Sequence, residues 1–354
     1  MNKRLILPIL LFVQIVVVNF LSFFPEFVEK NYSNGLYPYI AKASRWLLGS
    51  VRFSVGDVIY FIVIFFLIRW LWNSRLSWRT KWQNNLLQGL GFLSVFYFLF
   101  HFLWAMNYHR VTLADKMSID TEYDDAQLYE FTTKLIAKTN ALHVSITNDS
   151  LSKVQVPHSR DQIFNISENG YRNLAKTYPH FEYNNPSVKK SLISLPLTYM
   201  GFGGYLNPFT NEAQVNDMLP MYSFAATSCH EMAHQIGYAS ESEANFVGFL
   251  AAVHNDDKYV KYSGYTLALR YCLRNWEIRN KGVAEELLAT VNAGILSNFQ
   301  ESKDFWDGYE TFIETGFKIF YDSFLKFNQQ DEGLESYSKF VNLVVNYYSD
   351  REIP

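Results

Sequence analysis

Hydrophobic positions divide the chain into two unlike parts. Three long apolar runs lie in its first third, whereas apolar residues after position 106 recur at helical spacing between charged ones. The hydrocarbon core of a bilayer is about 30 Å thick, so a helix of about 20 apolar residues crosses it. The runs therefore predict three transmembrane helices, at about residues 5–24, 55–72 and 86–106.

Basic residues around these runs predict how the chain crosses the membrane. The first apolar run is too long for the core of a signal peptide and lacks a small-residue cleavage site, so we expect a retained anchor. Lys3 and Arg4 precede the first span, and more basic residues crowd the link between the second and third spans. By the positive-inside rule both regions are cytoplasmic. Residues 25–54 and those from 107 onward are then expected outside the cytoplasm.

The first external loop contains one short amphipathic stretch, residues 37–48, which includes Arg45 and Trp46. Such a stretch is typical of a helix that lies at the membrane interface. An ordinary loop helix has the same pattern, and the sequence does not choose between the two.

The remainder, residues 107–354, is predicted to be one soluble domain. Helical spacing appears at 124–142 and 160–178, and β-prone runs between 188 and 219 are separated by Gly and Pro, which predicts two or three short strands. Further helices are predicted at 242–253, 259–280, 283–296, 303–327 and 334–348. The expected fold class is therefore α+β and predominantly helical, with a small β-sheet.

The candidate chemistry of this domain lies in the motif His-Glu-x-x-His formed by His230, Glu231 and His234. On a helix the two histidines lie one turn apart on one face, where both imidazoles can bind one metal ion. Glu231 lies beside them and can reach a metal-bound water without binding the metal itself. The motif therefore predicts a metal site with a catalytic general base.

Residues around the motif predict the ends of two helices. Ser223 is the expected N-cap of the histidine helix, and Gly237 is its expected C-terminal stop. Ser240 is the expected N-cap of a second helix, with Glu241 and Glu243 in its first turn. The helical setting that the motif requires is therefore predicted, and a second helix follows it after a short turn.

This helix pair resembles that of the gluzincin metallopeptidases, in which a Glu of the second helix is the third protein ligand of zinc. Residues Glu241-Ser-Glu-Ala-Asn245 are similar to the Glu-x-x-Ala-Asn run of several gluzincin families. The resemblance implies that His230, His234 and Glu241 bind Zn²⁺. It also implies that Asn245 forms a hydrogen bond with one ligand imidazole. Glu243 is the rival third ligand, although it points to another side of the helix.

Nearly the whole chain also resembles a family of bacterial membrane proteins, domain of unknown function 3810. In that family membrane spans precede a zincin-like domain with a His-Glu-x-x-His-Gln run and a Glu-Ala-Asn run. The resemblance implies a location in the bacterial inner membrane, but it brings no substrate. In zincins generally, an open strand edge beside the cleft binds an extended peptide. Residues 203–207 or 212–216 could supply that edge, and a plain hairpin is the alternative.

Composition narrows the partners of the protein. The net charge is −3, which gives no reason to expect nucleic acid, and the aromatic content of 18% suits a chain partly in lipid. The two cysteines, Cys229 and Cys272, indicate neither a disulfide framework nor a cysteine-based metal site, and Cys229, which lies beside His230, is expected to pack in the core.

Aromatic residues of the later helices recur too closely for one narrow stripe, so they are expected to build a core or a face resting on the membrane. Tyr262 and Tyr265 could place a hydroxyl near a developing oxyanion, although a buried pair is the more common arrangement. The closely spaced residues are Phe305, Trp306, Phe312, Phe317, Phe320 and Tyr321.

Together these features predict a membrane-anchored zinc metallopeptidase that hydrolyses peptides or proteins of the cell envelope. Because the ligands lie outside every predicted span, the reaction is expected in water near the membrane surface. A zinc-binding envelope sensor or assembly factor with little turnover is the first alternative. A structural membrane protein with an accidental motif is the second.

Overall fold

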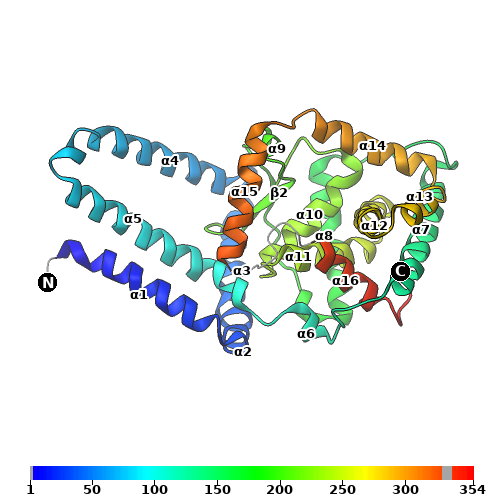
Figure 1. Cartoon of the computed structure of the whole chain (residues 1–354), viewed down its shortest axis with the longest axis horizontal. Coiled ribbons are helices and arrows are strands. Elements are labelled where there is room, and N and C mark those ends of the chain that lie inside the picture. The colour runs from blue at the N-terminus through cyan, green and yellow to red at the C-terminus, as the bar shows by residue number, and fades with distance from the viewer. Residues whose placement is uncertain (1–2, 329–336) are drawn as a thin grey trace.

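The computed structural model describes residues 3–328 and 337–354. Three long helices project from one end of the molecule, and the remaining helices and a small sheet form the other end (Figure 1). The expected class, a mostly helical α+β fold preceded by three apolar helices, is confirmed.

The three projecting helices are long and apolar enough to cross a membrane. α1 packs along α5, and most other side chains of these helices are exposed, as a lipid environment requires. Pro25 begins a new helix and ends the first span earlier than predicted, and the third span is displaced toward the N-terminus. These candidate spans are η1 (Lys3–Leu5) with α1 (Ile6–Leu21), α4 (Val55–Ser74) and α5 (Trp82–Leu103), and they are called the spans below.

The loop between the first two spans packs into the domain. It contains α2 (Pro25–Val28), the π-helical segment η2 (Glu29–Leu36) and α3 (Tyr37–Leu48). One face of α3 is buried and consists of Tyr37, Ala41 and Arg45. On this face Tyr37 and Ala41 pack with Trp104 and Ala239. The predicted amphipathic helix therefore exists, and its inner face is docked on protein.

The domain is built from helices at most of the expected positions. The predicted helices 283–296 and 303–327 are each divided in two, because the chain turns at Thr290 and again after Gly308. The start of the predicted helix 334–348 lies outside the described residues. The helices are α6 (Leu113–Met117), α7 (Asp125–Thr147), α8 (Arg160–Thr177), α9 (Ser194–Tyr199), α10 (Met221–Gln235), α11 (Glu241–Val253), α12 (Lys258–Arg279), α13 (Lys281–Leu288), α14 (Ala293–Asp307), α15 (Phe312–Phe327) and α16 (Tyr337–Tyr347), with 3-10 turns η3 (Ser77–Arg79), η4 (Ala105–His109) and η5 (Pro179–Phe181).

The sheet has three short strands in the order β1-β3-β2. β1 (Val188–Lys190) is parallel to β3 (Glu212–Val215), and β2 (Gly204–Asn207) is antiparallel to it. Short strands in this region were expected, but Ser194–Tyr199 is helical. Because β3 is paired on both sides, residues 212–216 cannot supply an open edge. Only β2 retains that role from the two candidates.

The core of the domain is formed where α8, α11 and α12 surround α10. Gly248 allows α11 to lie directly against α10, since a Cβ there would be 2.8 Å from the backbone nitrogen of His230. Cys229 is fully buried in this core, as expected, and Cys272 is also free and fully buried. The close approach of α10 and α11 fixes the relation between the histidines and the acidic start of α11.

Candidate metal centre

The histidine helix, α10, has one expected end and one unexpected end. It begins at Met221 after Pro220, so the prediction of Ser223 as the N-cap is wrong, and the Ser223 hydroxyl donates to the Pro220 carbonyl instead. Gly237 has a φ of +91°, the left-handed conformation that glycine adopts without strain, and stops the helix as predicted. Ser240 precedes α11 as expected, but its side chain makes no capping hydrogen bond.

The two motif histidines face each other. Nε2 of His230 lies 3.1 Å from Nε2 of His234, and both residues are largely buried. The side chains of His230, Glu231 and His234 form a group that could hold a metal ion, since one candidate ligand atom from each lies within 4.8 Å of the others.

A carboxylate of α11 completes the cluster. Oε2 of Glu241 lies 3.2 Å from Nε2 of His230 and 3.9 Å from Nε2 of His234. The rival residue, Glu243, points elsewhere, because its Oε1 accepts a hydrogen bond of 2.6 Å from the backbone nitrogen of Leu113. The structure thus brings Glu241, and not Glu243, to the imidazoles.

The outer nitrogens of both imidazoles have acceptor partners. Nδ1 of His230 lies 2.9 Å from Oδ1 of Asn245, and Nδ1 of His234 lies 2.6 Å from the Tyr238 carbonyl oxygen. A neutral imidazole that donates from Nδ1 has its lone pair on Nε2. Two such lone pairs would face each other across 3.1 Å, so a proton or a cation is needed between them.

The spacing of the three donors suits a metal ion. Ligand atoms about 2.1 Å from a tetrahedral zinc lie about 3.4 Å apart. The separations in this cluster are 3.1, 3.2 and 3.9 Å. Two nitrogens and one carboxylate oxygen are also a common ligand set of catalytic zinc. Geometry and donor chemistry therefore both fit.

Glu231 lies beside the cluster in an enclosed position. Its side chain is buried, and Oε2 has no hydrogen-bond partner among the described residues. Burial, opposed by the charge of His230, raises the pKa of Glu231 to about 8. A Cβ at Gly204 would lie 2.6 Å from Oε1 of Glu231, so the start of β2 passes directly over this carboxylate.

Residues next to the spans hold the end of the histidine helix. Tyr37 and Arg45 both donate to the carbonyl oxygen of Gln235 at 2.9 Å. Trp104 donates to that of His234 at 3.1 Å, and Arg110 to that of Gly237 at 2.8 Å. The carbonyl of His234 also accepts from the backbone nitrogen of Gly237, and the four side chains add hydrogen bonds where the regular pattern of α10 ends. No spacing in the sequence indicated them.

A tyrosine from a distant helix also reaches the cluster. The hydroxyl of Tyr321 in α15 donates to Oε1 of Glu241 at 2.5 Å. The tyrosines considered from the sequence are turned away, since Tyr262 donates to Asn298 and Tyr265 to the carbonyl of Pro354. Both hydroxyls are therefore engaged by other partners, and the expected buried packing of the pair is confirmed.

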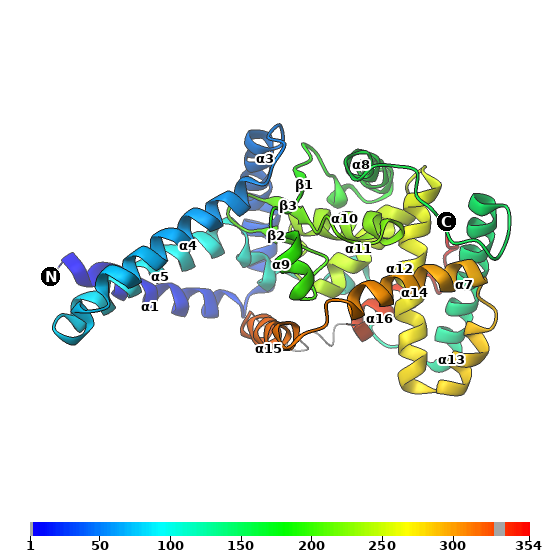
Figure 2. The same cartoon turned by 90° about the horizontal axis from the view of Figure 1, so that it is seen from above.

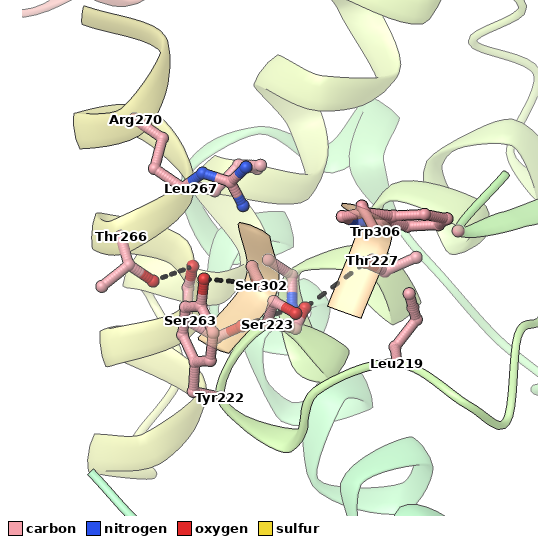
Figure 3. Close-up of a pocket in the computed structure, with 12 residues that line it drawn as sticks. Leu219, Tyr222, Ser223, Thr227, Ser263, Thr266, Leu267, Arg270, Ser302 and Trp306 are labelled. Atoms are coloured by element: carbon pink, nitrogen blue, oxygen red, sulfur yellow. Dashed lines mark hydrogen bonds between the residues drawn. The ribbon is translucent and has the colours of Figure 1, made fainter. Parts of the chain in front are cut away.

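A partly enclosed pocket of about 110 Å³ lies between α10, α12 and α14 (Figure 3), and its lining reaches to within one helical turn of Glu231 along α10. Two lining residues connect the pocket to Glu231. Gly203 precedes Gly204, which covers the Glu231 carboxylate, and Thr227 lies one turn before Glu231 on α10. Figure 3 shows the guanidinium of Arg270 turned from α12 toward Trp306. Among the described residues, no carboxylate forms an ion pair with Arg270.

A family model described as "Protein of unknown function (DUF3810)" matches residues 32–345. The matched region begins after the first span and includes the whole cluster. No curated protein and no solved structure is significantly similar to the chain.

Proposed function

The chain belongs to the DUF3810 family, whose function is unknown, and we propose that it is a membrane-anchored, zinc-dependent metallopeptidase. One observation carries the proposal. His230, His234 and Glu241 bring three donor atoms within 3.9 Å of one another, and beside them lies the buried carboxylate of Glu231, whose Oε2 has no hydrogen-bond partner among the described residues.

In this proposal His230, His234 and Glu241 are the protein ligands of Zn²⁺. Three protein ligands leave one coordination position open, as in catalytic rather than structural zinc sites. Zinc, when bound, supplies a Lewis acid that lowers the pKa of water toward about 7 and polarises a carbonyl group. The hydrogen bonds from His230 to Asn245 and from His234 to Tyr238 orient both imidazoles for this task.

Glu231 is the general base. It accepts a proton from the attacking water and later donates that proton to the amine that leaves the cleaved peptide bond. Its buried position supports the second step, because burial raises the pKa of Glu231 and so favours the protonated form that donates to the leaving amine.

The substrate is proposed to be an extended peptide. β2 is the edge strand that passes over Glu231 at Gly204, so its free side can pair with a peptide backbone beside the reacting groups. The neighbouring pocket then receives one substrate side chain. Because no carboxylate of the described part of the chain pairs with Arg270, and Ser223 and Thr227 are also present, we infer a preference for an acidic or polar side chain there.

The location of the chain indicates the kind of substrate. The three helices can span a membrane, and the basic residues at their ends favour a cytoplasmic N-terminus. The catalytic domain would then face the outside of the inner membrane of a bacterium. Its substrates would be cell-envelope peptides, envelope proteins or exposed segments next to the bilayer, and no nucleic-acid partner is expected.

The test compares wild-type full-length protein with Glu231→Gln in detergent or nanodiscs, using an unbiased peptide mixture and mass spectrometry. We expect the variant to bind as much zinc as wild type and to cleave at least about 100-fold more slowly. Glu277→Gln, an exposed change on α12, is the matched control. Equal cleavage by wild type and Glu231→Gln would exclude the peptidase, whereas zinc binding without any cleavage would favour the sensor.

A further inference from the structure

The helix α15 has an apolar face that packs on the domain and a second apolar face that does not. Tyr321, Phe324 and Leu325 point inward, where Tyr321 reaches Glu241 and Leu325 is fully buried. The outward face exposes large apolar side chains, with Phe312 86%, Ile319 65% and Phe320 65% accessible. An apolar surface of this kind on a single helix marks an interaction site.

The charges of α15 are kept away from its outward face. Lys318 pairs with Glu314 at 2.5 Å, and Lys326 pairs with Asp322 at 2.8 Å, in both cases one turn apart along the helix. Each residue of a helix is rotated by about 100° about the axis from the one before it, so these four residues lie on the opposite side of α15 from Phe320. The outward face, formed by Phe312, Ile313, Gly316, Phe317, Ile319 and Phe320, contains no charged side chain.

The position of α15 identifies what covers this face. α15 lies where the spans meet the domain, and its axis runs across the direction of the spans (Figures 1 and 2). Phe324 packs 6.1 Å from the ring of Phe100, near the end of α5, and 6.4 Å from that of Tyr108. A helix at this level and in this direction is parallel to the bilayer that the spans cross.

We propose that the outward face of α15 is seated in the interface of the same bilayer that anchors the chain. An amphipathic helix binds there with its apolar side about 5–10 Å into the boundary between headgroups and acyl chains. The three spans already hold α15 at the surface, so little entropy is lost when its phenylalanines and isoleucines enter it. The bilayer then supports the helix that places the Tyr321 hydroxyl on Glu241.

The experiment measures the depth of α15 in the full chain. Phe320→Cys carries an environment-sensitive fluorophore in nanodiscs, and Ile278→Cys on α12, 73% exposed and on a helix far from the spans, is the matched control (Figure 2). Both native cysteines are fully buried and so are protected from the label. Ile319→Cys repeats the measurement one position away, in case the change at Phe320 disturbs folding.

We expect blue-shifted emission at positions 320 and 319, strong quenching by lipids brominated near the headgroup, and little quenching by aqueous iodide. Position 278 should show the reverse. Equal iodide quenching at 320 and 278 would overturn the proposal. A second result would also overturn it. If the emission at position 320 is blue-shifted and depends on protein concentration, but brominated lipids do not quench it, a second copy of the chain covers this face. The Glu231→Gln background gives the same readout, so failure here leaves the proposed hydrolysis untouched.

Discussion

Oδ1 of Asn245 lies 2.9 Å from Nδ1 of His230, although the two residues belong to different helices. The helix that supplies Glu241 therefore also fixes the ring orientation and tautomer of a histidine on its neighbour. Asn245 is itself held, because its amide nitrogen donates to the hydroxyl of Tyr271 at 3.2 Å. The metal cluster and the packing of α10 on α11 are thus one structural unit.

Asn245→Ala should weaken metal binding without unfolding the protein. Loss of the acceptor lets the His230 ring rotate and change tautomer, and removal of such a partner lowers metal affinity by about 10- to 100-fold. Competition between the full-length protein and a chromogenic zinc chelator measures the change. Asn165→Ala, at an exposed position of α8, is the control and should retain wild-type affinity. Equal affinities for the two variants would contradict the role of Asn245.

Gly248→Ala should separate the two helices. The added methyl group would lie 2.8 Å from the backbone nitrogen of His230, so α11 must move away from α10. We expect a loss of about 1–3 kcal/mol in stability together with weaker zinc binding. Thermal unfolding with and without zinc checks both effects. Gly282→Ala is the control, because its new methyl group meets only a side chain at 3.5 Å. An unchanged melting temperature for Gly248→Ala would be unexpected.

Glu29 should make stability depend on pH. Burial alone raises the pKa of Glu29, but hydrogen bonds and charges from Arg110 and Lys116 lower it from 4.5 to about 2. Because the folded-state pKa is the lower one, this stabilisation is complete above about pH 4.5 and is lost as the pH falls toward 2. Glu29→Gln should therefore be less stable than wild type at pH 7, by about 2–4 kcal/mol, and lose less on acidification.

Thermal unfolding of wild type and Glu29→Gln at pH 7 and at about pH 3, within the range where the stabilisation is lost, measures this difference. Glu26→Gln, an exposed change in the same segment, should keep the wild-type dependence on pH. If the stability of Glu29→Gln and that of Glu26→Gln change equally with pH, the ion pairs of Glu29 with Arg110 and Lys116 do not cause the pH dependence. The group is relevant to the metal centre, since Arg110 also donates to the carbonyl of Gly237 at the end of α10.

Arg270→Ala should change which peptides are cleaved. If the guanidinium binds an acidic substrate side chain, its loss removes a charge-assisted hydrogen bond and reduces cleavage of such peptides by about 10-fold or more. Peptides with other side chains at that position should be cleaved as before. Arg274→Ala, one turn away and paired with Glu277 on the surface, is the control. A uniform loss across the peptide library would show that Arg270 is structural.

Much of the fold was accessible from local patterns. The spans follow from apolar length, and the helices of the domain follow from periodicity, because each depends on neighbours within one or two turns. The histidine pair was found for the same reason, since a separation of four residues places two side chains on one face. Glu241 could be predicted as a ligand only from the resemblance to gluzincins, because its distance from the histidines depends on how two helices pack.

The contacts that the sequence did not indicate join distant segments. Tyr321 meets Glu241 across 80 positions, and Tyr37 meets Gln235 across 198. No periodicity connects such residues, so only the packed structure reveals them. The division of the predicted helix 303–327 was missed for a different reason, because no proline marks it. There α14 ends before Gly308, and the Thr311 side chain caps α15 by accepting from the nitrogen of Ile313.

The zinc K-edge X-ray absorption spectrum of the purified full-length protein tests the central claim most directly. The account predicts one zinc ion per chain, with only nitrogen and oxygen atoms bound to it. The spectrum should show scattering from two imidazole rings, and this scattering should be weaker in His234→Ala. A protein that binds no zinc after incubation with the metal, or a shell that contains no imidazole, would contradict it.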